Sequence, residues 1–137
     1  TPQVFLCSNP GYDEEYGVNL IEGIAWTISE ITFHIYGIKG KSHDNVIYHG
    51  EESSERFDEE IKDFQCGLRL NDFDGMSEVI YKSILLGQHP ISRLYYPYIT
   101  YVKDTTDLIN ALRDLKNKKE PNLVGREYWL EKAHRSL

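Results

Sequence analysis

An acid, a glycine and a serine stand close together in the stretch NDFDGMSEV, residues 71–79. Asp74-Gly75 follows an apolar run typical of a strand, and Ser77 stands where an apolar helical pattern begins. The first backbone N–H groups of a helix are unpaired and, with the helix dipole, attract anions or hydroxyl oxygens. Gly75 would let a ligand approach the backbone, and Asp74 could accept hydrogen bonds from sugar hydroxyls. The stretch therefore has two interpretations: a binding site, or an ordinary Asp-Gly turn followed by a serine helix cap.

Short apolar runs alternate along the chain with longer stretches of helical periodicity. The sequence predicts strands at 4–7, 32–36, 46–48, 66–70, 90–94 and 99–102. It predicts helices at 16–29, 51–63, 76–87 and 105–115, and a last one from Pro121 to about His134. This order predicts an α/β fold, a Rossmann-like parallel sheet of about six strands with helices on both faces. Ligands of such sheets bind beyond the carboxyl ends of the strands, which nominates loops 8–15, 37–41, 49–53 and 71–77.

The composition is that of one globular domain over residues 1–137. Fifteen basic and 22 acidic residues, a net charge of −7, argue against nucleic acid as a partner. The acidic runs 13–15 and 51–60 are interpreted as solvated faces. No apolar run approaches the roughly 18–20 residues of a membrane span, and no signal peptide opens the chain. Cys7 and Cys66 lie in predicted strands, which predicts reduced core thiols in a cytoplasmic protein.

Several segments, taken in order, resemble the C-terminal, donor-binding half of group 1 (family 4-like) glycosyltransferases, enzymes with the two-domain GT-B fold. The segments are EYGVNLIEGIAW, YGIKG, NVIYHG, GLRL, FDGMSEVIYKSILLGQHPI, VKDTTDLINALRDL and GREYWLEKAHRSL. In that family a strand leads to an acid and a glycine-containing loop, and the following helix carries a second acid eight positions later. Asp74 takes the place of the first acid. The abrupt start of the chain, without an initiator methionine, is interpreted as excision from a longer chain or as loss of the first residue.

The resemblance implies that the full-length protein is a hexosyltransferase. It would move a sugar from a UDP-, GDP- or similar donor to a hydroxyl of a carbohydrate or lipid-linked acceptor. The acceptor would be held by a missing N-terminal domain, so the isolated chain is expected to bind donor and to be inactive. The family implies no metal or other cofactor for the transfer and no firmly assigned protein nucleophile, so the catalytic residues stay unassigned. The full enzyme could associate peripherally with a membrane.

The resemblance also implies a set of donor-binding residues. They are Asp74, Gly75, Met76, Ser77, Glu78, Lys82, Ser8, Asn9, Gly11, Arg69, Tyr48 and His49. The acid at 74 and the amides that follow it would hold the sugar and the phosphate. The loop after the first strand would face the diphosphate, and the strand end at 48–49 would face the base.

Three departures from the family pattern weigh against catalysis. Lys82 stands in place of the second acid, the first loop SNPGYDEEYG carries no cation, and the first acid is shortened to aspartate. Removing one fixed donor to the developing charge typically costs about 2.7–4 kcal/mol, so the lost cations would need replacement by Arg69, Lys39, Lys41 or Lys82. Lys82 also stands four residues after Glu78, the spacing of a helix ion pair. The alternatives are a degenerate, non-catalytic scaffold or interaction domain, and a flavodoxin-like binding domain.

The remaining aromatic, histidine and cysteine residues have structural interpretations. Trp26 and Trp129 lie on apolar helix faces and are predicted to be core residues. His34 is predicted to be packed in its strand. The five histidines and two cysteines lack the spacing of a zinc site. The aromatic run RLYYPYITY is interpreted as packing or as a contact with the absent domain.

Overall fold

The computed structural model describes residues 1–72 and 77–135, and the strands and helices below belong to these residues. The strands are β1 (Gln3–Cys7), β2 (Thr32–Tyr36), β3 (Val46–Gly50), β4 (Cys66–Arg69), β5 (Ile91–Ser92) and β6 (Thr100–Tyr101). The α-helices are α1 (Val18–Ile24), α2 (Ser54–Ile61), α3 (Glu78–Leu85), α4 (Thr105–Asp114) and α5 (Leu123–Arg135). Two 3-10 turns, Ala25–Thr27 and Leu115–Asn117, follow α1 and α4.

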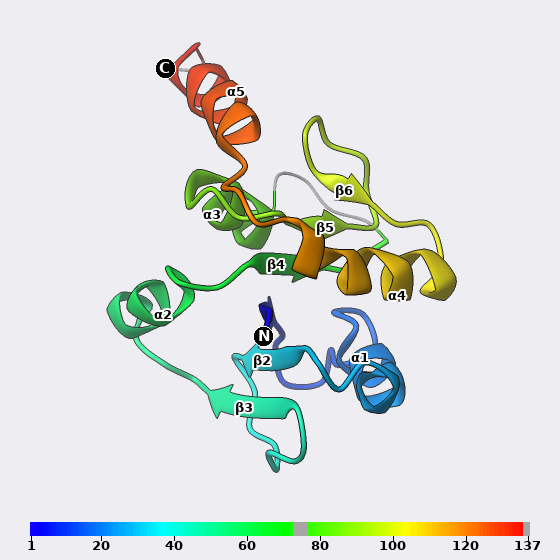
Figure 1. The fold of residues 1–137 in the computed structure, drawn as a ribbon. Coiled ribbons are helices and arrows are strands. Elements are labelled where there is room, and N and C mark those ends of the chain that lie inside the picture. The colour runs from blue at the N-terminus through cyan, green and yellow to red at the C-terminus, as the bar shows by residue number, and fades with distance from the viewer. Residues whose placement is uncertain (73–76, 136–137) are drawn as a thin grey trace.

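Within the described residues, six parallel strands form one sheet in the order β3-β2-β1-β4-β5-β6 (Figure 1). The chain runs outward from β1 to β3, returns to the centre at β4, and then runs outward in the other direction. The strand order therefore reverses between β1 and β4, as it does in Rossmann-like sheets. This arrangement confirms the predicted α/β fold with a parallel sheet of six strands.

Alternation of side chains along the strands divides the core into two layers. Val4 and Leu6 of β1 point to the layer that holds α1 and α4, whereas Phe5 points to the layer that holds α2 and α3. Figure 1 shows α1 and α4 on one side of the sheet and α2 and α3 on the other. The last helix, α5, packs on α3 through Trp129, so helices cover both faces as predicted.

A buried polar network holds α3 close against β4. Gly67 leaves room for this approach, because a Cβ at that position would lie 2.7 Å from the Cβ of Ser83. The Ser83 hydroxyl accepts a hydrogen bond from the Gly67 N–H (2.8 Å) and donates one to Gln88 Oε1 (2.7 Å). Gln88 in turn donates to the carbonyl of Ile61 at the end of α2 (2.7 Å). The network thus ties two helices to the centre of the sheet.

Three helix starts follow from local side-chain capping. Ser53 accepts a hydrogen bond from the N–H of Arg56 and so caps α2. Ser77 caps α3 in the same way, through the N–H of Ile80. Asp104 caps α4 by accepting from the N–H of Asp107 (2.9 Å). Each cap satisfies an otherwise unpaired donor of the first turn, and the cap at Ser77 is the one predicted above.

The first helix is shorter than the predicted range 16–29, and this changes the environment of Trp26. Gly17 has φ +85°, a conformation that precedes the helix rather than continuing it, and the α-helix ends at Ile24. The tighter 3-10 turn that follows rotates Trp26 off the apolar stripe, so its side chain is 77% exposed. The prediction that Trp26 is a core residue is therefore wrong, whereas Trp129 is buried as predicted.

The segment between β5 and β6 contains the aromatic run, which divides into two groups. Tyr96 packs against Trp129, whereas Tyr95, Tyr98 and Tyr101 are exposed. The two strands are shorter than predicted, and a connection without a helix joins them. None of the helices in the described ranges has the length and apolar character that crossing a bilayer requires.

Candidate functional site

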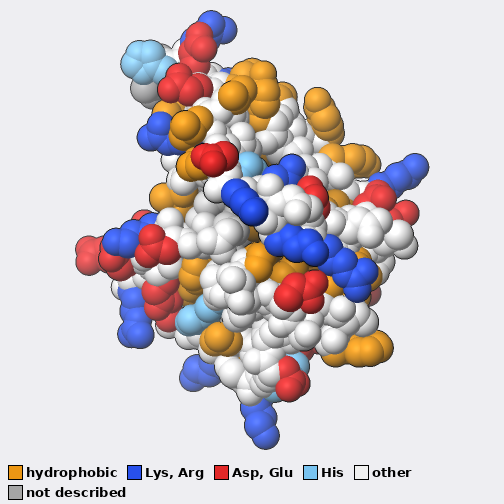
Figure 2. Space-filling model, viewed as in Figure 1, with side chains coloured by type: hydrophobic (Ala, Val, Ile, Leu, Met, Phe, Trp, Pro, Cys, Tyr) orange, Lys and Arg blue, Asp and Glu red, His pale blue; other side chains and the backbone are white. Residues whose placement is uncertain are grey.

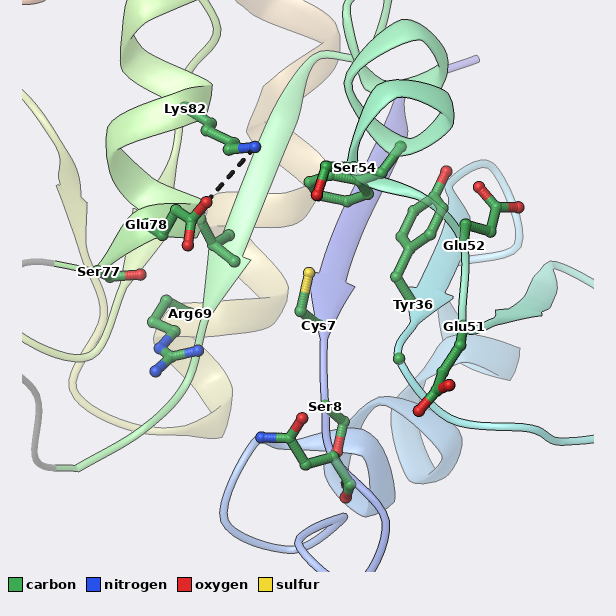
Figure 3. Close-up of a pocket in the computed structure, with 14 residues that line it drawn as sticks. Cys7, Ser8, Tyr36, Glu51, Glu52, Ser54, Arg69, Ser77, Glu78 and Lys82 are labelled. Carbon is green, nitrogen blue, oxygen red and sulfur yellow. Dashed lines mark hydrogen bonds and ion pairs between the residues drawn. The ribbon is translucent and has the colours of Figure 1, made fainter.

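A cavity of about 560 Å³ opens beyond the carboxyl ends of β1, β2 and β4 (Figure 3). Its walls are Cys7, Ser8, Asn9, Tyr36, Gly37, Glu51, Glu52, Ser54, Phe57, Arg69, Ser77, Glu78, Val79 and Lys82. The cavity lies where the strand order reverses, the usual place of a ligand site in an open parallel sheet. Its volume is within the range of roughly 300–1,000 Å³ that small-molecule sites occupy.

Local backbone geometry brings the strand ends together at this cavity. Ser8 directly follows β1, and its N–H donates to the carbonyl of Tyr36 at the end of β2 (2.9 Å). Gly37 has φ +95°, and a Cβ there would overlap the carbonyl oxygen of Ser8. Only glycine therefore fits at the point where the loops after β1 and β2 meet. Arg69, the last residue of β4, completes this edge.

Two cationic side chains reach the cavity. The guanidinium carbon of Arg69 lies 4.8 Å from the centre of the Tyr16 ring, a cation–π contact. Lys82 Nζ lies 2.6 Å from Asp58 Oδ1 and 3.5 Å from Glu78 Oε1. Burial opposes the charge of Lys82, but the hydrogen bond and charge of Asp58 raise its pKa above the ordinary value. The predicted ion pair with Glu78 is confirmed, although the closer partner is Asp58.

Three carboxylates face the same cavity and limit its affinity for an anion. They are Glu51, Glu52 and Glu78, so the described lining carries more acids than cations. Figure 3 shows Arg69 and Glu78 on one side, Tyr36 and Glu51 on the other, and Cys7 and Ser8 between them. The positive charge of the described lining is therefore on the side of Arg69 and Lys82, where the Glu78 carboxylate partly offsets it.

The acidic run 51–60 is only partly the solvated face that was predicted. Glu55, Asp58 and Glu59 are exposed, and Figure 2 shows acidic and basic side chains mixed over α2. Glu52 and Glu60 instead turn toward the sheet and are partly buried. The prediction of a solvated face is wrong for these two residues, because they share one side of the loop and helix that pack beside β2 and β3.

His49, Glu52 and Glu60 come together beside the cavity, and one ligand atom of each lies within 4.8 Å of the others. Burial, and then a hydrogen bond with Glu60, raise the pKa of Glu52. Burial works against ionisation of Glu60 as well, but hydrogen bonds from Glu52 and Tyr36 lower its pKa. The pKa values of the two neighbouring carboxyl groups are thus shifted in opposite directions. These three side chains are the described residues with the donor types and proximity to hold a metal ion.

Half of the sequence-predicted site residues meet at this cavity. Six of them line it: Ser8, Asn9, Arg69, Ser77, Glu78 and Lys82. Tyr48 lies on the opposite face of the sheet, where its hydroxyl donates to Glu22 of α1 (2.8 Å). Gly11 lines a separate depression with Lys39. His49 belongs to the adjoining cluster with Glu52, and Asp74, Gly75 and Met76 lie outside the described residues.

The sequence interpretation missed the side chains that alternate with the core residues of β1 and β2. Cys7 and Tyr36 point to the same layer as Phe5, and both line the cavity at the strand ends. Period-2 alternation from Phe5 was the signal that could have placed Cys7 there. Burial raises the pKa of the Cys7 thiol to about 12. The thiol is therefore neutral at physiological pH and lines the cavity without acting as a nucleophile. Cys7 and Cys66 are free thiols, as predicted.

No protein-family model matches the sequence, and no curated protein matches it either. Solved structures do match in fold. TarM is 17% identical, with a TM-score of 0.70 over 95% of this chain and 32% of TarM. GlyE, a glycosyltransferase of Streptococcus pneumoniae, is 15% identical, with a TM-score of 0.62 over 83% of this chain and 32% of GlyE.

The catalytic domain of starch synthase IV from Arabidopsis thaliana, bound to ADP and acarbose, is 14% identical. Its TM-score is 0.60 over 93% of this chain and 33% of that domain. A TarM mutant of S. aureus, in a complex that contains UDP, matches with 15% identity and a TM-score of 0.61, over 94% of this chain and 30% of that one. The chain thus spans about a third of the length of these proteins, and its fold is the Rossmann-like fold of a GT-B glycosyltransferase domain.

Proposed function

We propose that the chain is the nucleotide-sugar-binding domain of a glycosyltransferase of the GT-B class, the C-terminal half of a longer enzyme. The full enzyme transfers a hexose from a UDP- or GDP-type donor to a hydroxyl of a carbohydrate or lipid-linked acceptor. The observation that carries this proposal is the cavity at the strand-order reversal of a GT-B-like sheet, bordered by Arg69 and Lys82. Two proteins of the same fold hold nucleoside diphosphates, UDP in TarM and ADP in starch synthase IV.

In the proposed reaction this domain binds the diphosphate that leaves when the sugar is transferred. As the bond to the sugar breaks, negative charge grows on the diphosphate, and fixed donors near it lower the barrier. Arg69 at the end of β4 and Lys82 of α3 supply positive charge from two rigid elements. The acceptor and any group that takes up its proton come from the other domain, so the isolated chain binds donor without turnover. Transfer on this scheme needs no metal ion.

The proposal is tested by titrating the chain with UDP, GDP and their sugars, followed by calorimetry and amide NMR shifts. We expect saturable binding, with shifts at Ser8, Asn9 and Arg69. Arg69→Gln should weaken UDP binding about tenfold or more, because a charge-assisted hydrogen bond contributes roughly 1.5–3 kcal/mol. Arg113→Gln is the matched control, because it removes the same charge from α4 on the opposite face, where Arg113 binds the carbonyl of Thr27. Equal losses in both variants would contradict the proposed site.

A non-catalytic scaffold is the second candidate function. It is favoured by the three carboxylates of the cavity and by the pairing of Lys82 with Asp58. Absence of saturable binding below millimolar nucleotide would favour the scaffold over the nucleotide-sugar site. The sequence-based role of Asp74 is tested in the same titration, with Asp74→Ala expected to abolish binding and Glu30→Ala to leave it intact. We place the enzyme in the cytoplasm because its thiols are unpaired.

A further inference from the structure

We propose that His49, Glu52 and Glu60 form a binding site for a divalent transition-metal ion of the zinc type. His49 is in β3, Glu52 is in the following loop, and Glu60 is in the last turn of α2. The site shares Glu52 with the cavity, whereas His49 and Glu60 are not among the side chains that line the cavity. It does not rest on the proposed function, since its ligands can bind an ion whether or not the cavity binds a nucleotide.

The spacing of the three side chains fits a shared metal better than direct hydrogen bonds. His49 Nδ1 lies 3.4 Å from Glu52 Oε1 and 3.6 Å from Glu60 Oε1. Hydrogen bonds of this type are usually about 2.7–3.2 Å long. Nitrogen and oxygen ligands bind zinc at roughly 2.0–2.2 Å, so two ligands at a tetrahedral angle lie about 3.3–3.6 Å apart. The observed separations are therefore close to those of ligands around one ion.

A chain of hydrogen bonds orients the imidazole of His49 for this role. Gln3 Oε1 can only accept, so His34 donates to it from Nε2 (2.6 Å). In its neutral form His34 then accepts at Nδ1, and the donor to it is His49 Nε2 (2.8 Å). In a neutral His49 the other ring nitrogen, Nδ1, then carries a lone pair. It faces the carboxyl groups of Glu52 and Glu60. Metal-binding histidines commonly donate their other ring N–H in this way.

One oxygen of the Glu52 carboxylate is buried without a hydrogen-bond partner, and a bound cation would compensate for that loss. The Glu52 side chain is only 9% exposed, and the buried oxygen is Oε2. A buried polar atom without a partner costs about 1–3 kcal/mol, and more when it is charged. Arg56 is a cation in reach, but its Nε lies 3.8 Å from Glu52 and 3.5 Å from Glu60, and its side chain is 73% exposed. The contact with Glu52 is to Oε1, so Arg56 does not satisfy the buried Oε2.

Tyr36 positions two of the three ligands. Its hydroxyl donates to Glu60 Oε1 (3.1 Å), and its ring stacks on His49 with centroids 4.3 Å apart and planes 6° apart. Tyr36 also lines the cavity. A bound ion would therefore join the loop after β3 to α2 and hold the Glu51–Glu52 wall of the cavity in place. This role is structural and leaves the transfer step metal-independent.

The test is calorimetric titration of EDTA-treated, desalted chain with Zn²⁺, together with the visible absorption of the Co²⁺ form. We expect 1:1 micromolar binding and Co²⁺ bands of a nitrogen–oxygen site with four ligands. His49→Gln and Glu60→Gln should each weaken Zn²⁺ binding beyond the roughly 10–100-fold typical of losing an outer partner. Arg56→Gln should tighten it about two- to fivefold, by removing a competing charge.

Glu22→Gln is the matched control, because Glu22 also pairs with a histidine, the exposed His43 (2.7 Å), whose other ring nitrogen faces Asp44 (3.3 Å). It should leave Zn²⁺ affinity unchanged. Far-UV circular dichroism and metal-free melting confirm that each variant folds. The proposal is overturned by the absence of saturable Zn²⁺ binding, or by equal losses in Glu60→Gln and Glu22→Gln. UDP titration of metal-free chain is a separate measurement, so failure of the nucleotide site and of the metal site can be distinguished.

Discussion

Lys82 Nζ and Asp58 Oδ1 lie 2.6 Å apart, so an ion pair joins α3 to α2 at the rim of the cavity. The partners are 24 residues apart in the chain, and the contact is shorter than the one between Lys82 and Glu78 within α3. Lys82 also lies 5.2 Å from the centre of the Phe57 ring. Asp58 therefore competes with any anionic ligand for the charge of Lys82.

Removing that competition should strengthen nucleotide binding. We expect Asp58→Asn to tighten the affinity for UDP about two- to fivefold, since a partly exposed ion pair contributes about 0.2–1 kcal/mol. Lys82→Gln should weaken it. Calorimetry measures both. Glu59→Gln is the control, because it removes a carboxylate from the same helix that pairs with Lys62 instead (2.6 Å). A gain in Glu59→Gln equal to that in Asp58→Asn would mean that only net charge matters.

The Ser83 network should contribute measurably to the free energy of unfolding. Ser83→Ala leaves the buried N–H of Gly67 without its acceptor and Gln88 without its donor. We expect a loss of about 1–3 kcal/mol in urea denaturation. Ser54→Ala, at an exposed position in the first turn of α2, should change stability by less than about 0.5 kcal/mol. Equal effects of the two substitutions would contradict the network's role.

The buried imidazole of His34 should make stability depend on pH. Burial, and then the neighbouring His49, lower the pKa of His34 from 6.5 to about 4. Below pH 6.5 the His34 imidazole binds a proton in the unfolded state but stays neutral in the folded state. The contribution of His34 is therefore fully present above pH 6.5 and is lost as the pH falls toward 4. Urea denaturation of metal-free protein between pH 7.5 and 4 should show this, and His34→Gln should flatten the slope.

His43 should change the pH dependence of stability in the direction opposite to His34. Hydrogen bonds to Glu22 and then to Asp44 raise its pKa, so its contribution is present at low pH and is lost as the pH rises through that pKa. His43→Gln should thus reduce stability at pH 5 more than at pH 8. A His34→Gln profile with the same sign as the His43→Gln profile would contradict the burial of a neutral His34.

The two tryptophans should differ sharply in their effect on stability. Trp129 of α5 is buried, and its Nε1 donates to the carbonyl of Pro97 (3.0 Å). Trp129→Ala should cost about 3–5 kcal/mol, the usual range for removing a large core aromatic side chain. Trp26→Ala should cost less than about 0.5 kcal/mol, since its indole lies in solvent. Chemical denaturation followed by circular dichroism compares them, and similar losses would show that Trp26 packs in solution.

Much of the fold could be predicted from the order of residues along the chain. Alternation of apolar runs and helical stretches identified the strands and helices, and the caps at Ser53, Ser77 and Asp104 were recognisable because a cap bonds a residue only three positions away. The extent of the first helix was not recognisable, since the 3-10 turn that exposes Trp26 continues the same apolar pattern.

The sites depended on tertiary structure. Half of the predicted donor-site residues meet at one cavity, because parallel strands place their carboxyl ends at one edge of the sheet. Tyr48 does not, since alternation within β3 points it at α1. The ion pair of Lys82 with Asp58 and the grouping of His49, Glu52 and Glu60 arise where α2 packs beside β2, β3 and α3. Sequence periodicity records which side chains are buried, whereas the partner of a buried or charged side chain is decided only when separate elements pack together.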